Sequence, residues 1–145
     1  AEMRRALRSA SYAAPKGQEA AYSEAIPAML ALLKAAHDAG ITIVPGTDAL
    51  AGYLLHHELE LYARAGIAPA EVLRMATLTS ARVMGADNRL GVIAPGKFAD
   101  MVLIDGDPTQ SIADVRRVDL VLKGGKVYDP AKIEAALGMT PRDAQ

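Results

Sequence analysis

The chain has 145 residues with a formal net charge of −1, and 51% of its residues are hydrophobic and 23% charged. This composition predicts one globular domain with a buried core, and the near-neutral charge offers no basic surface for nucleic acid or for an acidic membrane. No stretch reaches the roughly 20 apolar residues of a membrane span. Because the sequence lacks cysteine, it excludes disulfides, thiolate metal ligands and a cysteine nucleophile, and the cellular compartment stays undetermined.

The N-terminal third predicts a loop followed by an amphipathic helix. Residues 1–18 are rich in alanine and basic side chains and are expected to end a helix at the Pro15-Lys16-Gly17 loop signal. Ser23 is a candidate N-cap for the next helix, with Pro27 in its first turn and Gly40 at its end. The apolar residues of this helix recur at helical spacing, at Ile26, Met29, Leu30 and Leu33.

A run of β-favouring residues from Ile41 to Val44 leads directly into a Pro-Gly turn. Such a run predicts a short strand that is buried on both faces. Thr47 and Asp48 would then follow the carboxyl end of this strand, where parallel α/β folds gather their ligands and catalytic groups. Asp48 therefore fits a metal ligand or a general base, and a helix cap equally well.

The three histidines do not form a metal-binding pattern of their own. His37 lies near the C-terminal turn of its predicted helix, where a cap or surface role is favoured. His56 and His57 open a helix predicted from about residue 54 to residue 65, and adjacent side chains on a helix point about 100° apart. Either of these two could face the pocket beside Asp48, but one solvent-facing ring and one packed ring is the favoured alternative.

Two further helices are predicted before the texture of the sequence changes. Pro69 starts the first, which runs through Ala76. Thr79 or Ser80 is expected to cap the second, which ends at Gly85.

The last third of the chain predicts a small antiparallel sheet. Strands are expected at residues 99–104 and 115–122, and Lys123-Gly124-Gly125-Lys126 predicts a hairpin leading into Val127-Tyr128. A short helix is expected from Ala131 to Leu137. Two or three strands do not form a robust sheet alone, so this segment is expected to pair with strands from elsewhere.

Several of these motifs together resemble a known superfamily. They are Gly46-Thr47-Asp48-Ala49, Glu58-Leu59, Ala65-Gly66-Ile67-Ala68-Pro69, Ala76-Thr77 and the string from Leu90 to Asp100, which reads Gly-x-Ile-x-Pro-Gly-Lys-x-Ala-Asp from Gly91. Over roughly residues 37–138 the chain resembles the C-terminal part of the amidohydrolase superfamily, in its imidazolonepropionase-like and dipeptidase-like branch. The resemblance implies a metal-dependent hydrolase that cleaves an amide bond in a small substrate such as a dipeptide or a cyclic amide.

The resemblance implies an α/β fold in three parts. Residues 1–90 would carry the last strand, Ile41 to Val44, and helices of a TIM (β/α)₈ barrel. Residues 91–130 would supply strands of a small β-sandwich built from both ends of the chain, and residues 131–145 a C-terminal helix and tail. Within the string, Asp100 is expected to be structural rather than catalytic.

The same resemblance implies the site residues and the cofactor. Asp48 would contact a divalent metal, zinc in one or two ions, and accept a proton from the attacking water. If the chain is part of such an enzyme, residues that follow Asp48, notably Leu50, Tyr53 and His56, could line the substrate pocket.

The chain also departs from the superfamily in ways that shape the expectation. A TIM barrel needs about 250 residues, and the superfamily's other metal ligands have no match here. One carboxylate does not hold a catalytic zinc, which normally takes three protein ligands. The chain, which starts at Ala1 rather than Met, is therefore expected to be an incomplete fold, inactive by itself, whose partner is the missing N-terminal part of the enzyme. A homo-oligomer is compatible with the sequence, and the alternative function is a non-catalytic module that associates through exposed strand edges.

Overall fold

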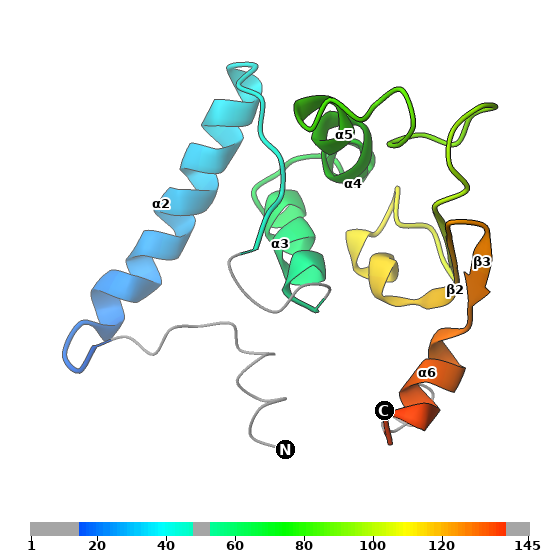
Figure 1. The fold of residues 1–145 in the computed structure, drawn as a ribbon. Helices are drawn as coiled ribbons and strands as arrows, with labels where there is room; N and C mark the ends of the chain where they lie inside the picture. The colour runs from blue at the N-terminus through cyan, green and yellow to red at the C-terminus, as the bar shows by residue number, and fades with distance from the viewer. Residues whose placement is uncertain (1–14, 48–52, 139–145) are drawn as a thin grey trace.

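The computed structural model of the protein describes residues 15–47 and 53–138. Helices fill the first part of the chain and a three-stranded antiparallel sheet follows (Figure 1). The elements in chain order are α2 (Glu19–Asp38), α3 (Tyr53–Arg64), α4 (Pro69–Arg74), the π-helix η1 (Met75–Thr79), α5 (Ser80–Val83), β1 (Met101–Ile104), the 3₁₀-helix η2 (Ile112–Arg116), β2 (Val118–Lys123), β3 (Lys126–Tyr128) and α6 (Pro130–Ala136). None of the helices in these ranges is long and apolar enough to cross a membrane.

Helix α2 begins earlier than its sequence predicted. Its N-cap is Gln18, so Ser23 is not the cap and Pro27 lies inside the helix rather than in its first turn. A proline in a helix interior forfeits one backbone hydrogen bond, and the surrounding alanines, which have the highest helix propensity, offset that loss. The helix ends as predicted before Gly40, which has a positive φ of 75°.

The segment that follows α2 corrects the central strand prediction. Residues 41–47 form no strand, and the side chains of Ile41 and Val44 are 60% and 36% exposed rather than buried on both faces. A strand is defined by its ladder of hydrogen bonds to a neighbour, and no such neighbour is present among the residues that the structure describes. The β-favouring composition of the run therefore does not by itself produce a strand.

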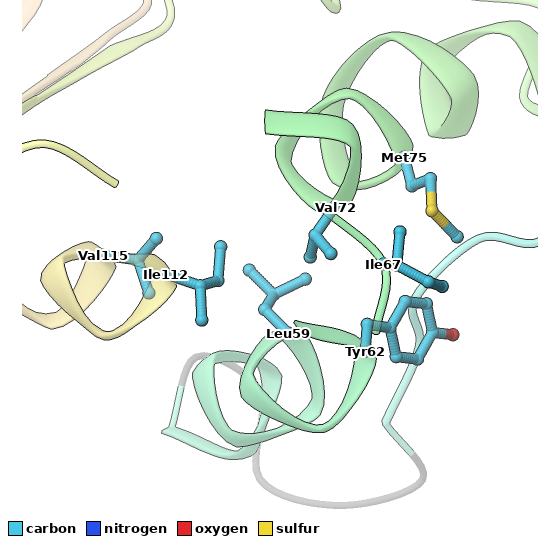
Figure 2. Close-up of a cluster of buried hydrophobic side chains, with 7 residues drawn as sticks. All are labelled: Leu59, Tyr62, Ile67, Val72, Met75, Ile112 and Val115. Carbon is cyan, nitrogen blue, oxygen red and sulfur yellow. The ribbon is translucent and has the colours of Figure 1, made fainter. Parts of the chain in front are cut away.

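Helix α3 carries the centre of the hydrophobic core. It forms as predicted, and Gly66, with a φ of 95°, follows its end. Leu59 and Tyr62 lie one turn apart on its inner face, and side chains from α4, η1 and η2 pack against them (Figure 2). The buried cluster consists of Leu59, Tyr62, Ile67, Val72, Met75, Ile112 and Val115.

Residues 69–83 form one continuous helical segment instead of two capped helices. Its middle turn, η1, is a π-helix, and Ser80 Oγ donates a hydrogen bond to the Met75 carbonyl oxygen at 2.8 Å. Thr79 and Ser80 both have helical backbone angles and make no side-chain cap bond, so the predicted cap between two helices is wrong. Gly85 follows the end of the segment, as predicted, with a φ of 64°.

The sheet has the order β1-β2-β3 and is antiparallel throughout. Gly124 and Gly125, both with positive φ, make the two-residue turn between Lys123 and Lys126 that the sequence predicted. The strand predicted from residue 115 begins only at Val118, because η2 precedes it. Ile112 and Val115 are three residues apart on η2, and both are buried against the α3 core.

Helix α6 closes the described part of the chain close to its predicted bounds. Asp129 is its N-cap, and its Oδ1 accepts hydrogen bonds from the backbone nitrogens of Ala131 and Lys132 at 3.0 Å and 3.3 Å. Pro130 occupies the first helical position, where the missing N–H costs nothing.

Candidate functional site

The turn at the carboxyl end of residues 41–47 is bound to helix α3. The Gly46 backbone N–H donates a hydrogen bond to Glu58 Oε1 at 3.0 Å. The Tyr62 hydroxyl lies 3.2 Å from the same Glu58 oxygen and 3.4 Å from the Val44 carbonyl oxygen, so its proton is shared between these two acceptors. Two side chains one turn apart on α3 therefore hold the turn that immediately precedes Thr47 and Asp48.

The electrostatics of this contact keep Tyr62 protonated. Burial, together with the charge and hydrogen bond of Glu58, raises the pKa of Tyr62 to about 12. With a pKa this high, the hydroxyl stays protonated at neutral pH and so remains a hydrogen-bond donor. The ring of Tyr62 is only 7% exposed and packs in the core (Figure 2).

Of the residues predicted to act in catalysis and in substrate binding, some fall outside the described ranges and others lie at the start of α3. Asp48 and Leu50 fall outside the residues that the structure describes. Tyr53 is the first residue of α3, although its side chain is not described, and His56 lies in the first turn of the same helix, partly buried. The roles predicted for these four residues stay predictions.

Within residues 15–47 and 53–138, no three histidine or carboxylate side chains come together in a way that could hold a metal ion. Neighbouring His57, for example, has its Nδ1 3.6 Å from Glu60 Oε2, an ordinary pair on one helix surface. The described residues therefore do not fit a resident metal on their own.

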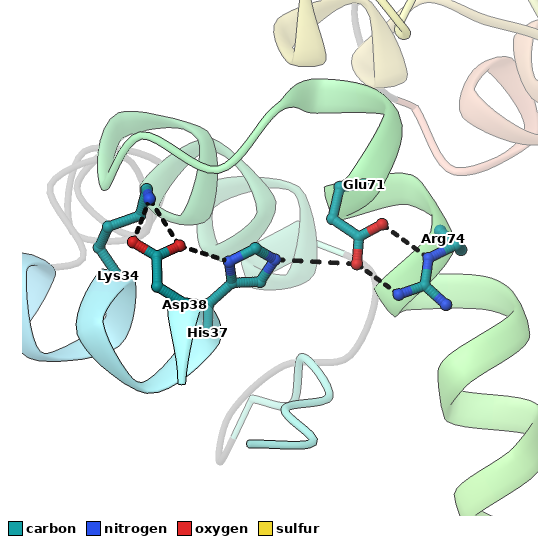
Figure 3. Close-up of polar contacts among 5 residues, drawn as sticks. All are labelled: Lys34, His37, Asp38, Glu71 and Arg74. Atoms are coloured by element: carbon teal, nitrogen blue, oxygen red, sulfur yellow. Dashed lines mark hydrogen bonds and ion pairs between the residues drawn. The ribbon is translucent and has the colours of Figure 1, made fainter. Parts of the chain in front are cut away.

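A second polar cluster joins the end of α2 to α4 (Figure 3). His37 Nδ1 lies 3.1 Å from Asp38 Oδ1 and its Nε2 lies 3.8 Å from Glu71 Oε1. Lys34 pairs with Asp38 at 2.5 Å, and Arg74 binds both oxygens of Glu71 at 2.6 Å. Hydrogen bonds from Lys34, and then from His37, lower the pKa of Asp38, and Arg74 lowers that of Glu71. His37 thus lies between two acids of different helices, a contact that its surface-role prediction did not include.

A cavity of about 440 Å³ lies beside this cluster. Residues 40–43 form one wall, and side chains of α4, η1 and α5, among them Arg74 and Arg82, form the other. Thr79 also lines it, and the Thr79 hydroxyl oxygen is buried without a hydrogen-bond partner. The cavity lies at the start of the 41–47 segment. Glu58 and Tyr62 contact the other end of this segment.

The string from Gly91 to Asp100 makes structural contacts. The Lys97 ammonium donates hydrogen bonds to the carbonyl oxygens of Asp87 and Leu90 and so stabilises the loop between these residues and Lys97. Asp100 pairs with Lys123 at 2.5 Å and accepts the Gly124 backbone N–H at 2.8 Å, which fixes the β2–β3 turn to the start of β1. These contacts agree with a structural role for Asp100.

An ion pair between residues 56 positions apart in the sequence connects α3 to η2, which leads into β2. Arg116 Nε lies 2.5 Å from Glu60 Oε1 and its NH2 group lies 3.1 Å from Glu60 Oε2, a bidentate arrangement between η2 and α3. The hydrogen bond from Arg116 lowers the pKa of Glu60.

Replacing Arg116 with Ala in the complete protein should lower the free energy of unfolding by about 1 kcal/mol at pH 7, since both side chains stay partly exposed and solvent screens the pair. A carboxylate whose folded-state pKa is depressed stabilises the fold above its unfolded-state pKa. The difference between wild type and variant should therefore vanish as the pH falls through the lowered pKa of Glu60. Urea titrations at several pH values measure this, and Arg117→Ala, which removes a more exposed pair with Asp105, is the control with the smaller effect. A difference that persists at low pH would contradict an electrostatic origin.

Comparison with known proteins places these features in a family. Residues 5–128 match the model of the Amidohydrolase family. The chain belongs to the amidohydrolase family. This match covers most of the chain and confirms the resemblance that its motifs indicated.

Individual members of the amidohydrolase family are similar to the chain over part of their length. An adenine deaminase of Jannaschia sp. (strain CCS1) is 38% identical over 75 residues, which cover 51% of this chain and 12% of that protein. An imidazolonepropionase of Geobacillus kaustophilus (strain HTA426) is 32% identical over 98 residues, covering 62% of this chain and 23% of that protein. The solved structure of a Xaa-Pro dipeptidase superposes with a TM-score of 0.66 at 28% identity, covering 71% of this chain and 26% of that one.

The chain therefore spans about a quarter or less of the relatives named here. They are hydrolytic members of the amidohydrolase family, and members of this family generally use divalent metals. The solved relative also confirms the coarse fold prediction, α/β content with a small antiparallel sheet.

Proposed function

We propose that this chain is the C-terminal part of a metal-dependent amidohydrolase that cleaves a carbon–nitrogen bond in a small substrate such as a dipeptide or a cyclic amide. The observation that carries the proposal is the family match over residues 5–128. The small share of each relative that the chain spans supports a partner, the N-terminal part of the enzyme.

The surface of the described residues supports such a partner. Large apolar side chains are exposed along α2, in the 41–47 segment and on the sheet, and exposed apolar surface can mark a protein–protein interface. Examples are Met29, Leu32, Ile41, Val102, Leu103 and Val127. In our proposal residues 41–44 pair as the last strand of a TIM barrel, and β1 to β3 join strands from the other chain end in a small sandwich.

Asp48 is the proposed proton carrier. Its carboxylate takes a proton from water while the water oxygen bonds to the carbonyl carbon of the substrate. The same proton then passes to the leaving nitrogen as the C–N bond breaks, so the carboxylate is regenerated. In this proposal the remaining metal ligands come from the N-terminal part of the enzyme, and Leu50, Tyr53 and His56 contact the substrate.

The complete enzyme that carries this chain should turn over at least one member of a panel of Xaa-Pro and other dipeptides, cyclic amides and aminopurines. Release of amine or ammonia is measured with and without prior removal of metal by a chelator. Turnover that disappears on chelation and returns with a divalent metal supports the proposal. A folded, metal-loaded enzyme that cleaves no C–N bond in the panel contradicts it.

A second candidate function is a non-catalytic association module. The exposed Val127 and Tyr128 on edge strand β3 favour it, because an unpaired edge can take up a strand from another protein. Residues 1–145 expressed alone decide between the two functions. Aggregation or loose packing supports the enzyme part, whereas a monomer with cooperative unfolding supports the module.

A further inference from the structure

Residues 44–46 lack the support that a strand end normally receives. Within the described residues, no neighbouring strand pairs with the 41–47 segment. Helix α3 contacts its carboxyl end through Glu58, which accepts from the Gly46 N–H, and through Tyr62, which contacts Glu58 and the Val44 carbonyl oxygen. Side chains rather than a ladder therefore fix this end of the segment.

The supporting side chains are themselves held firmly. Tyr62 is 7% exposed and is packed among Ile67, Val72 and Met75 (Figure 2). Its hydroxyl stays protonated, as shown above, and so remains a donor to Glu58. A buried ring thus orients the carboxylate, and the carboxylate in turn orients the backbone of the turn.

We propose that Glu58 and Tyr62 are positioning residues that fix the Pro45-Gly46 turn and thereby the carboxylate of Asp48, two residues further on. This inference rests on the proposed function, because the turn affects catalysis only if Asp48 is the proton carrier. Displacing a reacting group by about 1 Å can cost about 100-fold in rate even when the mutation lies far from the chemistry. Loss of the α3 contacts should therefore lower the rate more than it weakens substrate binding.

The chemistry of the contact distinguishes positioning from charge. Both described donors to Glu58, the Gly46 N–H and the Tyr62 hydroxyl, are neutral. A glutamine at position 58 offers an amide oxygen in the same place, so it keeps the acceptor and removes the charge. An alanine removes both. Tyr62→Phe removes only the hydroxyl and keeps the ring in the core.

The test compares these variants in the complete enzyme, with the best substrate of the panel. Glu58→Ala is expected to lower kcat about 10- to 100-fold with KM within about threefold, and Glu58→Gln to restore kcat to within about threefold of wild type. Tyr62→Phe should give an intermediate loss. Hydrogen exchange measured by mass spectrometry is the readout that does not depend on turnover: peptides covering residues 41–47 should exchange faster in Glu58→Ala and at the wild-type rate in Glu58→Gln.

Glu60→Gln is the matched control, since Glu60 lies on the same helix and pairs with Arg116 instead of the turn. It should leave kcat and the exchange of residues 41–47 unchanged. The inference is overturned if Glu58→Ala leaves both readouts at wild-type values, or if Glu58→Gln is as damaging as Glu58→Ala. Asp48→Asn, measured alongside, separates the proposed function from the positioning role. If this variant retains full activity, the proposed function fails. If it is inactive while Glu58→Ala is unaffected, only the positioning role fails.

Discussion

Replacing Asp48 with Asn in the complete enzyme is expected to lower kcat by about 10²- to 10⁴-fold, the range that a general acid–base contributes. The amide is close in size to the carboxylate but neither accepts the water proton nor delivers one to the leaving nitrogen. KM should change far less, because the side chains proposed to contact the substrate are untouched. Steady-state kinetics over the pH range of activity measure both constants.

Asp119→Asn provides the control for this substitution. Asp119 is exposed on β2, and the same chemical change there should leave kcat and KM at wild-type values. If Asp48→Asn retains wild-type turnover in the metal-loaded enzyme, Asp48 is not the proton carrier. The proposed function, in which Asp48 carries the proton, would then fail.

Replacing Gly91 with Ala is expected to be the most destabilising single change in the string from Gly91 to Asp100. Gly91 has a φ of 90°, and a Cβ there would lie 2.8 Å from Ala81 Cβ and 3.0 Å from Leu78 Cα. The left-handed backbone costs a residue with a Cβ about 1 to 2 kcal/mol, and overpacking a filled site adds about 1 to 3 kcal/mol. The free energy of unfolding should therefore fall by about 2 to 5 kcal/mol, measured by urea denaturation and circular dichroism.

Gly96→Ala separates the two contributions. Gly96 has a φ of 84°, close to that of Gly91, but a Cβ there would meet nothing within 4 Å. This variant should lose only the backbone contribution of about 1 to 2 kcal/mol. Equal losses in the two variants would show that the close approach of Gly91 to α5 does not limit stability.

Local signals predicted the elements whose causes lie within a few residues. The helix that ends at Gly66, the two-glycine turn after Lys123 and the short helix after Asp129 all formed where expected. In each case a helical period, a cap or a positive φ at glycine is sufficient. The family resemblance rested in part on the string from Gly91 to Asp100, which lies between these elements. The family match confirms the resemblance.

Features that depend on distant partners were not predictable in the same way. The run Ile41 to Val44 has strand composition, yet it forms no strand where no ladder partner is described. Residues 112–116 became a 3₁₀-helix because Ile112 and Val115 pack against α3, more than 40 residues away in sequence. Asp48 was predicted from its place after a β-favouring run, and that prediction is untested. Glu58 and Tyr62 were not predicted as site residues, since only the fold brings them to the turn. A glutamate and a tyrosine four residues apart on a helix would have been the sequence signal.

The bidentate pair between Glu60 and Arg116 constrains how this protein can be recombined with its relatives. A chimera that joins segment 91–128 of a relative to the native helices would replace Arg116, the partner of Glu60. It would also replace Gly91, which approaches Ala81 closely. Crossover points for such grafts should therefore carry positions 60 and 81 together with the incoming sheet, even though both lie in the preceding helices.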